Sequence, residues 1–308
     1  MTPNQLTYLI FGIVMVLALV FDLGLLSKKT ASMSMQKALW QTIFWLGLSA
    51  AFCGFMWYEN GMNMAISYIS AYLMEWSLSI DNIFVFILIF GAFRVRESNI
   101  PRVLLIGILI AILLRVIFIT VGVALIEKFN WLLYVFGAIL VYTGIKMFTA
   151  EHETEFDKEQ SAVYRFMRKY LRISDGEPAG RFTIRSNGKI YFTILSVVVV
   201  MLAVTDIVFA LDSIPAVFAI SHVPLVVYTS NIFAVLGLRS LFFLLRSAVN
   251  KFDYLQHGIA IVLVFIGLKM LAEIFHFTLP IYVSLIVIVV CLVGAILYSL
   301  YRSSKTDR

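Results

Sequence analysis

The chain has 308 residues, of which 61% are hydrophobic, 15% aromatic and only 14% charged. Soluble domains carry about 25% charged residues, and a helix needs about 20 apolar residues to cross a hydrocarbon core about 30 Å thick. The chain contains many apolar runs of this length. Its composition therefore excludes a soluble globular protein and predicts an all-α polytopic membrane protein.

Apolar runs predict nine transmembrane helices. The predicted ranges are 6–26, 38–58, 64–93, 101–126, 130–149, 190–220, 224–248, 254–275 and 279–301. The third and sixth ranges are about 30 residues long, which is more than one straight helix needs to cross the bilayer. We therefore expect these two helices to be tilted or broken.

Basic residues are strongly biased toward one side of these predicted helices. Alternate loops and the C-terminal tail hold 19 of the 24 Lys and Arg, whereas the N-terminus and the remaining loops hold one, Lys128. Because cytoplasmic loops are enriched in Lys and Arg, we expect the N-terminus outside and the C-terminus in the cytoplasm. The net charge of +6 is thus mostly a topology signal, and nucleic-acid binding has no separate support.

The longest predicted loop, 150–189, contains no sign of a catalytic domain. Its acidic run EHETEFDKE (151–159) is typical of a solvated linker. The segment SAVYRFMRKYLRI (161–173) has apolar residues at helical spacing with basic residues between them, which predicts a short helix on the anionic inner leaflet. RFTIRSNGKIYF (181–192) predicts a β-hairpin around Asn187 and Gly188. We expect neither enzymatic activity nor a permanently bound cofactor.

Two parts of the chain resemble each other. FNWLLYVFGAILVYTGIKM (129–147) aligns with FDYLQHGIAIVLVFIGLKM (252–270) at an offset of 123, and EWSLSIDNIF (75–84) aligns with DIVFALDSIP (206–215). The predicted helices of the two parts enter the membrane from opposite sides. An inverted repeat is typical of secondary transporters, whose substrate site lies near the bilayer midplane. We therefore divide the chain into two N-terminal helices (1–63), a first three-helix repeat (64–149), a cytoplasmic loop (150–189), an inverted second repeat (190–275) and a final helix with its tail (276–308).

Four acidic residues lie near the middle of the two longest predicted helices. They are Glu75, Asp81, Asp206 and Asp212. A charge at the bilayer centre costs roughly 2.5–3.5 kcal/mol on insertion scales, so four would cost on the order of 10 kcal/mol, comparable to the stability of a whole domain. These carboxylates must be paired, protonated or bound to a cation.

Ion pairing within the membrane is the competing interpretation. The basic residues inside the predicted helices are Arg115, Lys146, Arg239 and Lys269. Lys146 is expected near the inner face and Lys269 toward the outer face, so both lysines can extend to the interface. Arg115 and Arg239 then remain as charge partners for four acids, which favours an ion path over pairing alone.

The segment TDIVFALDSIPA (205–216) predicts half of a cation site in a broken helix. Pro215 cannot donate a hydrogen bond to the Leu211 carbonyl, which frees that oxygen beside Asp212. Carboxylates, carbonyls, Asn82 and Ser213 are hard oxygen ligands, which suit Mg²⁺, Ca²⁺ or Mn²⁺. Carboxylates at this depth can also carry protons, so proton antiport is chemically compatible with the pattern.

At these residues the sequence resembles a known family of bacterial integral membrane proteins. YLMEWSLSIDNIFVF, TDIVFALDSIPAVFAI, TSNIFAVLGLRSLFFLL and VFIGLKM are similar to motifs of the TerC/Alx family, and the resemblance includes Asp22 and the Asn-Gly hairpin. It implies a multi-pass protein of the cytoplasmic (inner) membrane, manganese export, a link to tellurium resistance and kinship with LysE-type exporters.

The resemblance also implies a set of site residues. The metal-binding positions are Glu75, Asp81, Asn82, Asp206, Asp212 and Ser213. We add Asp22 and Asn231 as accessory positions, together with Leu211 and Pro215 from the predicted helix break. One departure concerns Ala203, where many family members have a glutamate, and this could alter metal preference or stoichiometry.

These observations lead to the hypothesis of a Mn²⁺ exporter that works by alternating access with proton exchange. Its expected partners are the lipid bilayer, Mn²⁺ as transported substrate, and protons as the coupling ion. The sequence leaves open whether the protein forms a homo-oligomer. Alternatives are export of Ca²⁺, Mg²⁺ or Fe²⁺, export of an organic solute, or a membrane scaffold that assists assembly or metalation of exported proteins. Flux measurements separate the first two alternatives, and dependence on loop 150–189 would favour the scaffold.

Overall fold

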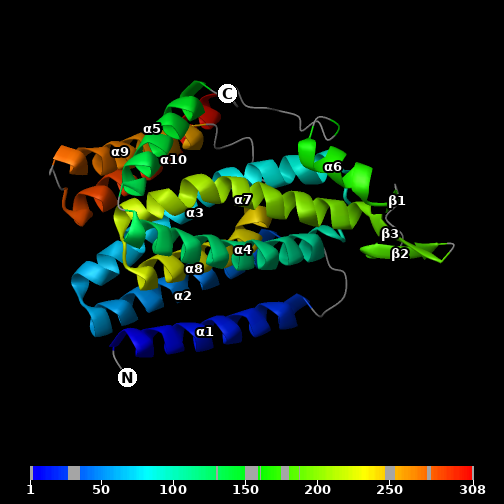
Figure 1. Ribbon diagram of the computed structural model, residues 1–308, viewed down its shortest axis with the longest axis horizontal. Helices are drawn as coiled ribbons and strands as arrows, with labels where there is room; N and C mark the ends of the chain where they lie inside the picture. The colour runs from blue at the N-terminus through cyan, green and yellow to red at the C-terminus, as the bar shows by residue number, and fades with distance from the viewer. Residues whose placement is uncertain are drawn as a thin grey trace.

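The protein forms a bundle of long helices with a small β-sheet at one end (Figure 1). This computed structural model describes residues 3–26, 35–129, 131–149, 159, 161–174, 180–186, 188–246, 254–275 and 279–306. The acidic run 151–158, Asn187 of the predicted turn and the side chains of Asp22, Asp81 and Asp212 lie outside the described part. The backbone at Asp22, Asp81 and Asp212 is helical.

Each of the nine predicted ranges contains a helix, so the all-α polytopic fold class is confirmed. These helices are α1 (Pro3–Leu26), α2 (Met35–Asn60), α3 (Met62–Ala92), α4 (Ile100–Lys128), α5 (Leu132–Thr149), α7 (Ile194–Ile220), α8 (Pro224–Arg246), α9 (Leu255–Ala272) and α10 (Ile281–Thr306). Six of them (α2, α3, α4, α7, α8 and α10) are long and apolar enough to cross a membrane. α1, α5 and α9 contain shorter apolar stretches, so nine crossings remain a prediction.

The helices α3 and α7, which we expected to be tilted or broken, are not broken, and their tilt stays a prediction. α3 and α7 are each continuous, and α7 runs through Pro215. A proline removes one backbone hydrogen bond and is tolerated in membrane helices when neighbouring helices hold the segment. Ser213–Ile220 is buried on all sides, which provides that support.

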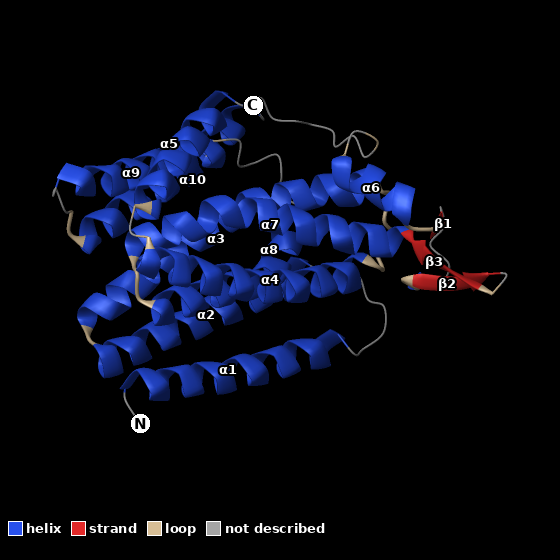
Figure 2. Ribbon diagram, in the orientation of Figure 1, coloured by secondary structure: helices blue, strands red, loops and turns tan. Residues whose placement is uncertain are grey.

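The sixth predicted range also begins too early, because residues 190–193 belong to a strand. β3 (Lys189–Thr193) pairs antiparallel with β2 (Thr183–Ser186) and parallel with β1 (Ile173–Ser174), and Ser186 lies opposite Lys189 (Figure 2). This register leaves a two-residue turn, and Gly188 has φ +74°, as the predicted Asn-Gly hairpin requires. The predicted hairpin is therefore confirmed, and it continues directly into α7.

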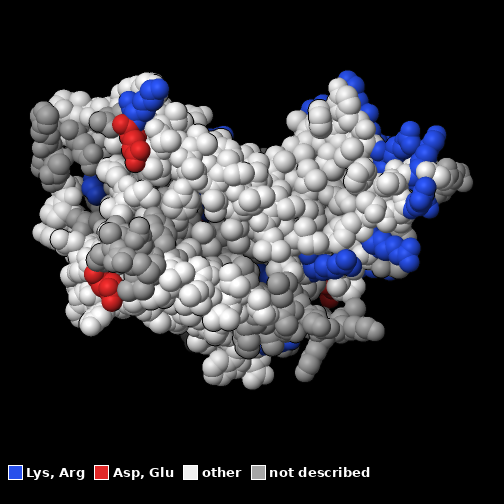
Figure 3. Space-filling view, turned by 60° about the horizontal axis from the view of Figure 1, so that its bottom comes forward, with Lys and Arg blue, Asp and Glu red and all other residues white. Residues whose placement is uncertain are grey.

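The predicted short helix in the long loop is also present, as α6 (Ala162–Tyr170), capped by the Ser161 hydroxyl. Tyr164 and Met167 are buried against the bundle, and basic side chains are exposed around them. Lys and Arg gather at this end of the molecule (Figure 3). The exposed basic residues described between positions 161 and 189 are Arg165, Arg168, Lys169, Arg172, Arg181, Arg185 and Lys189. Their clustering agrees with the predicted cytoplasmic end, although the orientation itself remains a prediction.

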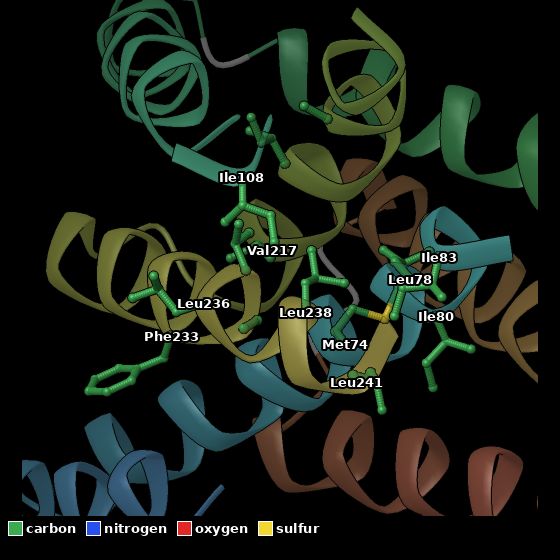
Figure 4. Close-up of a cluster of buried hydrophobic side chains, with 14 of the residues drawn as sticks. Met74, Leu78, Ile80, Ile83, Ile108, Val217, Phe233, Leu236, Leu238 and Leu241 are labelled. Carbon is green, nitrogen blue, oxygen red and sulfur yellow. The ribbon is translucent and has the colours of Figure 1, made fainter. Parts of the chain in front are cut away.

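The core of the bundle lies between α3, α4, α7 and α8, which pack against one another. Buried side chains from all four helices meet there, including Met74, Ile108, Val217 and Leu238 (Figure 4). α8 is buried on every face, since all residues of Phe233–Phe242 are buried. Polar residues in such a helix face neighbouring helices instead of lipid, which is where functional polar groups of membrane proteins lie.

α5 and α9 approach each other closely at small residues. A Cβ atom added to Gly267 would lie 2.6 Å from the Gly137 carbonyl oxygen, and one added to Gly144 would lie 2.8 Å from the Ala260 carbonyl oxygen. The sequence offset of 123 pairs Gly137 with Ala260 and Gly144 with Gly267. The contact between Gly137 and Gly267 therefore corresponds to the contact between Ala260 and Gly144. An inverted repeat requires such pairs of corresponding contacts, and the repeat itself stays a prediction.

Gly267→Ala should therefore destabilise the fold, because the added methyl group would push two backbones apart. Overpacking of this kind costs typically about 1–3 kcal/mol. Gly294→Ala is the matched control, since a Cβ atom there meets nothing within 4 Å. Thermal unfolding of the purified variants measures the difference, and equal unfolding temperatures for both variants would contradict this packing.

Candidate functional site: a buried carboxylate pair held by an arginine

Arg115, in the middle of α4, joins two acidic residues from different helices. Its Nε donates to Asp206 Oδ2 at 3.0 Å and its Nη2 donates to Asp206 Oδ1 at 2.9 Å, which makes a bidentate ion pair. Its Nη1 donates to Glu75 Oε1 and also to Asn231 Oδ1 at 3.1 Å. The four residues come from α3, α4, α7 and α8, the helices that form the core.

All four members of this network are removed from the surface. Glu75 and Asn231 are 0% exposed, Asp206 is 1% exposed and Arg115 is 2% exposed. Two carboxylates and one guanidinium carry a net charge of −1. A buried charge is costly unless it is paired and hydrogen-bonded, so this network retains an attraction for a further positive charge.

Local hydrogen bonding orients Asn231 toward the arginine. Its Nδ2 donates to the Val227 carbonyl oxygen one turn earlier at 3.2 Å. The amide nitrogen is therefore occupied, and the amide oxygen is the atom that faces Arg115. This explains why the accessory position Asn231 belongs to the charge network.

Several buried polar atoms on the helices that form the core have no hydrogen-bond partner within the part of the chain described. On α3 they are Tyr72 Oη, Glu75 Oε2, Ser79 Oγ and Asn82 Nδ2, and on α7 the atom is Ser213 Oγ. The α3 residues follow a 3-4-3 spacing, so they share one face of the helix. Buried polar groups are normally satisfied by protein, water or a ligand, so this face is suited to water or a bound ion.

Asn82 and Ser213 lie on opposite sides of the carboxylate pair. α4 and α7 run in the same direction, since Gly107 approaches Leu202 and Gly122 approaches Phe218. α3 is joined to α4 by a short turn, so α3 and α7 run in opposite directions (Figure 1). Asn82 is seven residues after Glu75 and Ser213 is seven after Asp206, which places them about 10 Å along their helices in opposite directions. The predicted six-residue site is thus spread along the bundle.

The remaining predicted residues have different surroundings. Arg239 is 3% exposed within α8, and Pro215 is buried in α7. The Leu211 side chain is 55% exposed on the outside of the bundle. Within the described residues there is no group of three or more His, Cys, Asp and Glu side chains arranged to hold a metal ion. Because the side chains of Asp81 and Asp212 are not described, their role in a site is still a prediction.

Lys269 departs from the expectation that it extends to the interface. It is 7% exposed, and its Nζ donates to Ser284 Oγ at 3.1 Å and to the Ala219 carbonyl oxygen at 3.4 Å. The carbonyl lies at the C-terminal end of α7, where a cation is favoured by the helix dipole. Lys146, by contrast, is exposed, as expected.

Tyr72 and Ser79 belong to the polar face of α3 but were not predicted from the sequence. Each lies about one helical turn from Glu75, and this spacing was the available signal. Hydroxyl residues are common in membrane helices, so spacing alone did not distinguish them from serines such as Ser77, which donates to its own helix at the Met74 carbonyl.

Comparisons with known proteins agree with this architecture. Residues 60–307 match the family described as "Integral membrane protein TerC family". The chain is 40% identical to the "Putative membrane-bound redox modulator Alx" of Salmonella typhi, over 97% of this chain and 95% of the relative. It is 40% identical to an "Uncharacterized membrane protein" of Rickettsia felis, over 98% of this chain and all of the relative. A Myxococcus xanthus membrane protein is 42% identical, over 92% of this chain and 89% of the relative.

No solved structure matches the chain. The family match covers most of the described helices, including the four that carry the arginine network. The relatives are similar over nearly their whole length, so the likeness is not restricted to one segment. The chain therefore belongs to the TerC family of integral membrane proteins.

Proposed function

We propose that this protein is a secondary transporter that exports Mn²⁺ from the cytoplasm, using Glu75 and Asp206 as the central carboxylates of the ion path. The observation that supports this most strongly is the buried network of these two carboxylates with Arg115. It lies between four packed helices, and unpaired polar atoms lie next to it on α3. Ionisable residues inside membrane bundles characteristically mark ion paths.

The chemistry of the polar atoms favours a hard divalent cation. Carboxylates, the Asn82 side chain and the Ser213 hydroxyl offer oxygen ligands, which suit Mn²⁺, Mg²⁺ and Ca²⁺. In this proposal Asp81 and Asp212 extend the site, each next to one of these polar residues. Among the three cations we propose Mn²⁺, because the resemblance of the sequence motifs to the TerC/Alx family implies manganese export.

Proton exchange is the proposed coupling. Glu75 Oε1 accepts from Arg115, whereas Glu75 Oε2 has no partner among the described residues. Oε2 is therefore the atom at which a proton would be held on the return step. The two close contacts between α5 and α9 correspond to each other under the sequence offset of 123. This correspondence supports alternating access by inverted repeats. The proposal places the protein in the bacterial cytoplasmic membrane, with its N-terminus outside.

The cellular manganese content tests this function. Mn-sensitive cells should contain less manganese when they express the wild-type protein, but not when they express a variant with amides at Glu75, Asp81, Asp206 and Asp212. Both proteins must be present in the membrane at equal levels. Equal lowering by both would contradict a role for the carboxylates, and no lowering by either would contradict manganese export and favour the scaffold.

Export should not depend on thiol chemistry, although some relatives carry the name redox modulator. The chain has two cysteines, Cys53 on α2 and Cys291 on α10, both unbonded to another sulfur. Cys53 Sγ donates to the Ala65 carbonyl oxygen at 3.6 Å, which is a structural contact. A Cys53→Ser/Cys291→Ser variant should lower cellular manganese as the wild type does. Loss of export in this variant at equal membrane level would contradict the expectation.

A further inference from the structure

Arg115 occupies the position that a cation bridging Glu75 and Asp206 would need. The guanidinium uses Nε and Nη2 for both oxygens of Asp206 and Nη1 for Glu75. An arginine side chain is not deprotonated in proteins. A metal ion can therefore bind both carboxylates directly only after the guanidinium has moved away from them.

We propose that Arg115 is a tethered competitor of the transported cation. This inference rests on the proposed export function. When no metal is bound, the guanidinium neutralises part of the charge of the two buried carboxylates, and an incoming Mn²⁺ replaces it there. Arg115 thus sets how tightly the ion path binds its cation, a role beyond that of a fixed ion-pair partner.

The network and the adjoining part of α3 offer neutral acceptors to a displaced guanidinium. Asn231 Oδ1 already accepts a hydrogen bond from Nη1 at 3.1 Å. Ser79 lies one turn after Glu75 on α3, and its hydroxyl oxygen has no partner within the described ranges. A short movement of a long, flexible side chain can therefore exchange charged acceptors for neutral ones.

Charge explains why such a competitor is useful in a carrier. Glu75, Asp206 and Arg115 sum to −1 without metal and to +1 with one Mn²⁺, because the guanidinium stays in the bundle. Two like charges near each other in a medium of low dielectric constant repel strongly. The retained arginine therefore weakens Mn²⁺ binding and favours release of the ion to the other side of the membrane.

Equilibrium binding of Mn²⁺ to the purified full-length protein in detergent, measured by isothermal titration calorimetry, tests the inference. Arg115→Gln removes the competing charge and should tighten binding by at least about tenfold, equivalent to about 1.4 kcal/mol. Arg246→Gln is the matched control, because it removes an exposed arginine paired with Glu97 at 3.0 Å and should leave the affinity unchanged. A merely structural arginine would give the opposite result, since its loss would weaken binding.

A second variant is needed in case Arg115→Gln does not fold. Arg115→Lys keeps the positive charge but cannot form the bidentate pair with Asp206, so it should tighten Mn²⁺ binding by roughly twofold to fivefold, which is under 1 kcal/mol. Affinity equal to or weaker than that of the wild type, in a folded variant, would overturn the inference.

The outcomes separate this inference from the proposed function. If the wild type binds Mn²⁺ and the arginine variants bind no tighter, the competitor role is wrong while export can still hold. If the wild type binds too weakly to detect and Arg115→Gln binds measurably, the inference is supported. If neither the wild type nor any folded arginine variant binds Mn²⁺, both the inference and the proposed function are contradicted.

Discussion

Glu75→Gln and Asp206→Asn should each reduce Mn²⁺ export by about 10-fold to 100-fold, while the protein remains in the membrane. Each change keeps the size of the side chain and removes one negative charge from the central pair. A hydrogen bond to a charged group contributes about 1.5–3 kcal/mol. Each 1.4 kcal/mol of binding free energy corresponds to a factor of about ten in affinity. Cellular manganese content at equal protein level measures the loss.

The matched control for this prediction is Glu97→Gln. Glu97 is an acidic residue outside the bundle core, with a side chain that is 73% exposed and paired with Arg246. Exposed ion pairs contribute little to stability, so this variant should export like the wild type. Export at the wild-type rate by both Glu75→Gln and Asp206→Asn would mean that the buried pair is structural and that the ion path lies elsewhere.

Arg115→Met should lower the free energy of unfolding by about 3–5 kcal/mol, because it leaves two buried carboxylates without their counter-charge. Glu75 and Asp206 would then lie close together with exposures of 0% and 1%. Unfolding of the purified protein in detergent by heat or denaturant measures this change. The effect should appear as a lower midpoint than that of the wild type.

A triple variant separates the charge effect from the loss of packing. Glu75→Gln/Arg115→Met/Asp206→Asn removes all three charges together, so it should recover a substantial part of the stability lost in Arg115→Met. If Arg115→Met is as stable as the wild type, the ion pairs do not hold the four core helices together. If the triple variant is no more stable than Arg115→Met, the loss comes from packing.

Apolar runs were sufficient to predict the helices of the fold. Long apolar segments form helices in a membrane because every backbone polar group must be satisfied internally, and each predicted range contains a helix. The Asn-Gly turn predicted the hairpin for a similarly local reason. The strand at 190–193 was missed because KIYFT is as apolar as the start of a membrane helix, and its pairing with β2 is a contact beyond local sequence.

The candidate site was predictable in composition but not in arrangement. Acids inside apolar runs identified Glu75 and Asp206, since such charges are costly in lipid. The sequence also offered Arg115 as a partner, yet it could not predict that one guanidinium would contact both acids and Asn231. That geometry depends on how α4 packs against three other helices. The proline in α7 predicted a break for local reasons, and packing of the surrounding helices overrode it.

The central claim is that the buried carboxylate pair moves Mn²⁺ across a membrane. The most direct measurement is Mn²⁺ entry into liposomes that contain the purified protein and a dye quenched by Mn²⁺, compared with liposomes lacking protein. We expect the wild type to admit Mn²⁺ faster than protein-free liposomes, and we expect this excess rate to be about 10-fold to 100-fold smaller for Asp206→Asn. A wild-type rate no faster than that of protein-free liposomes, or an Asp206→Asn rate equal to the wild-type rate, would contradict the claim.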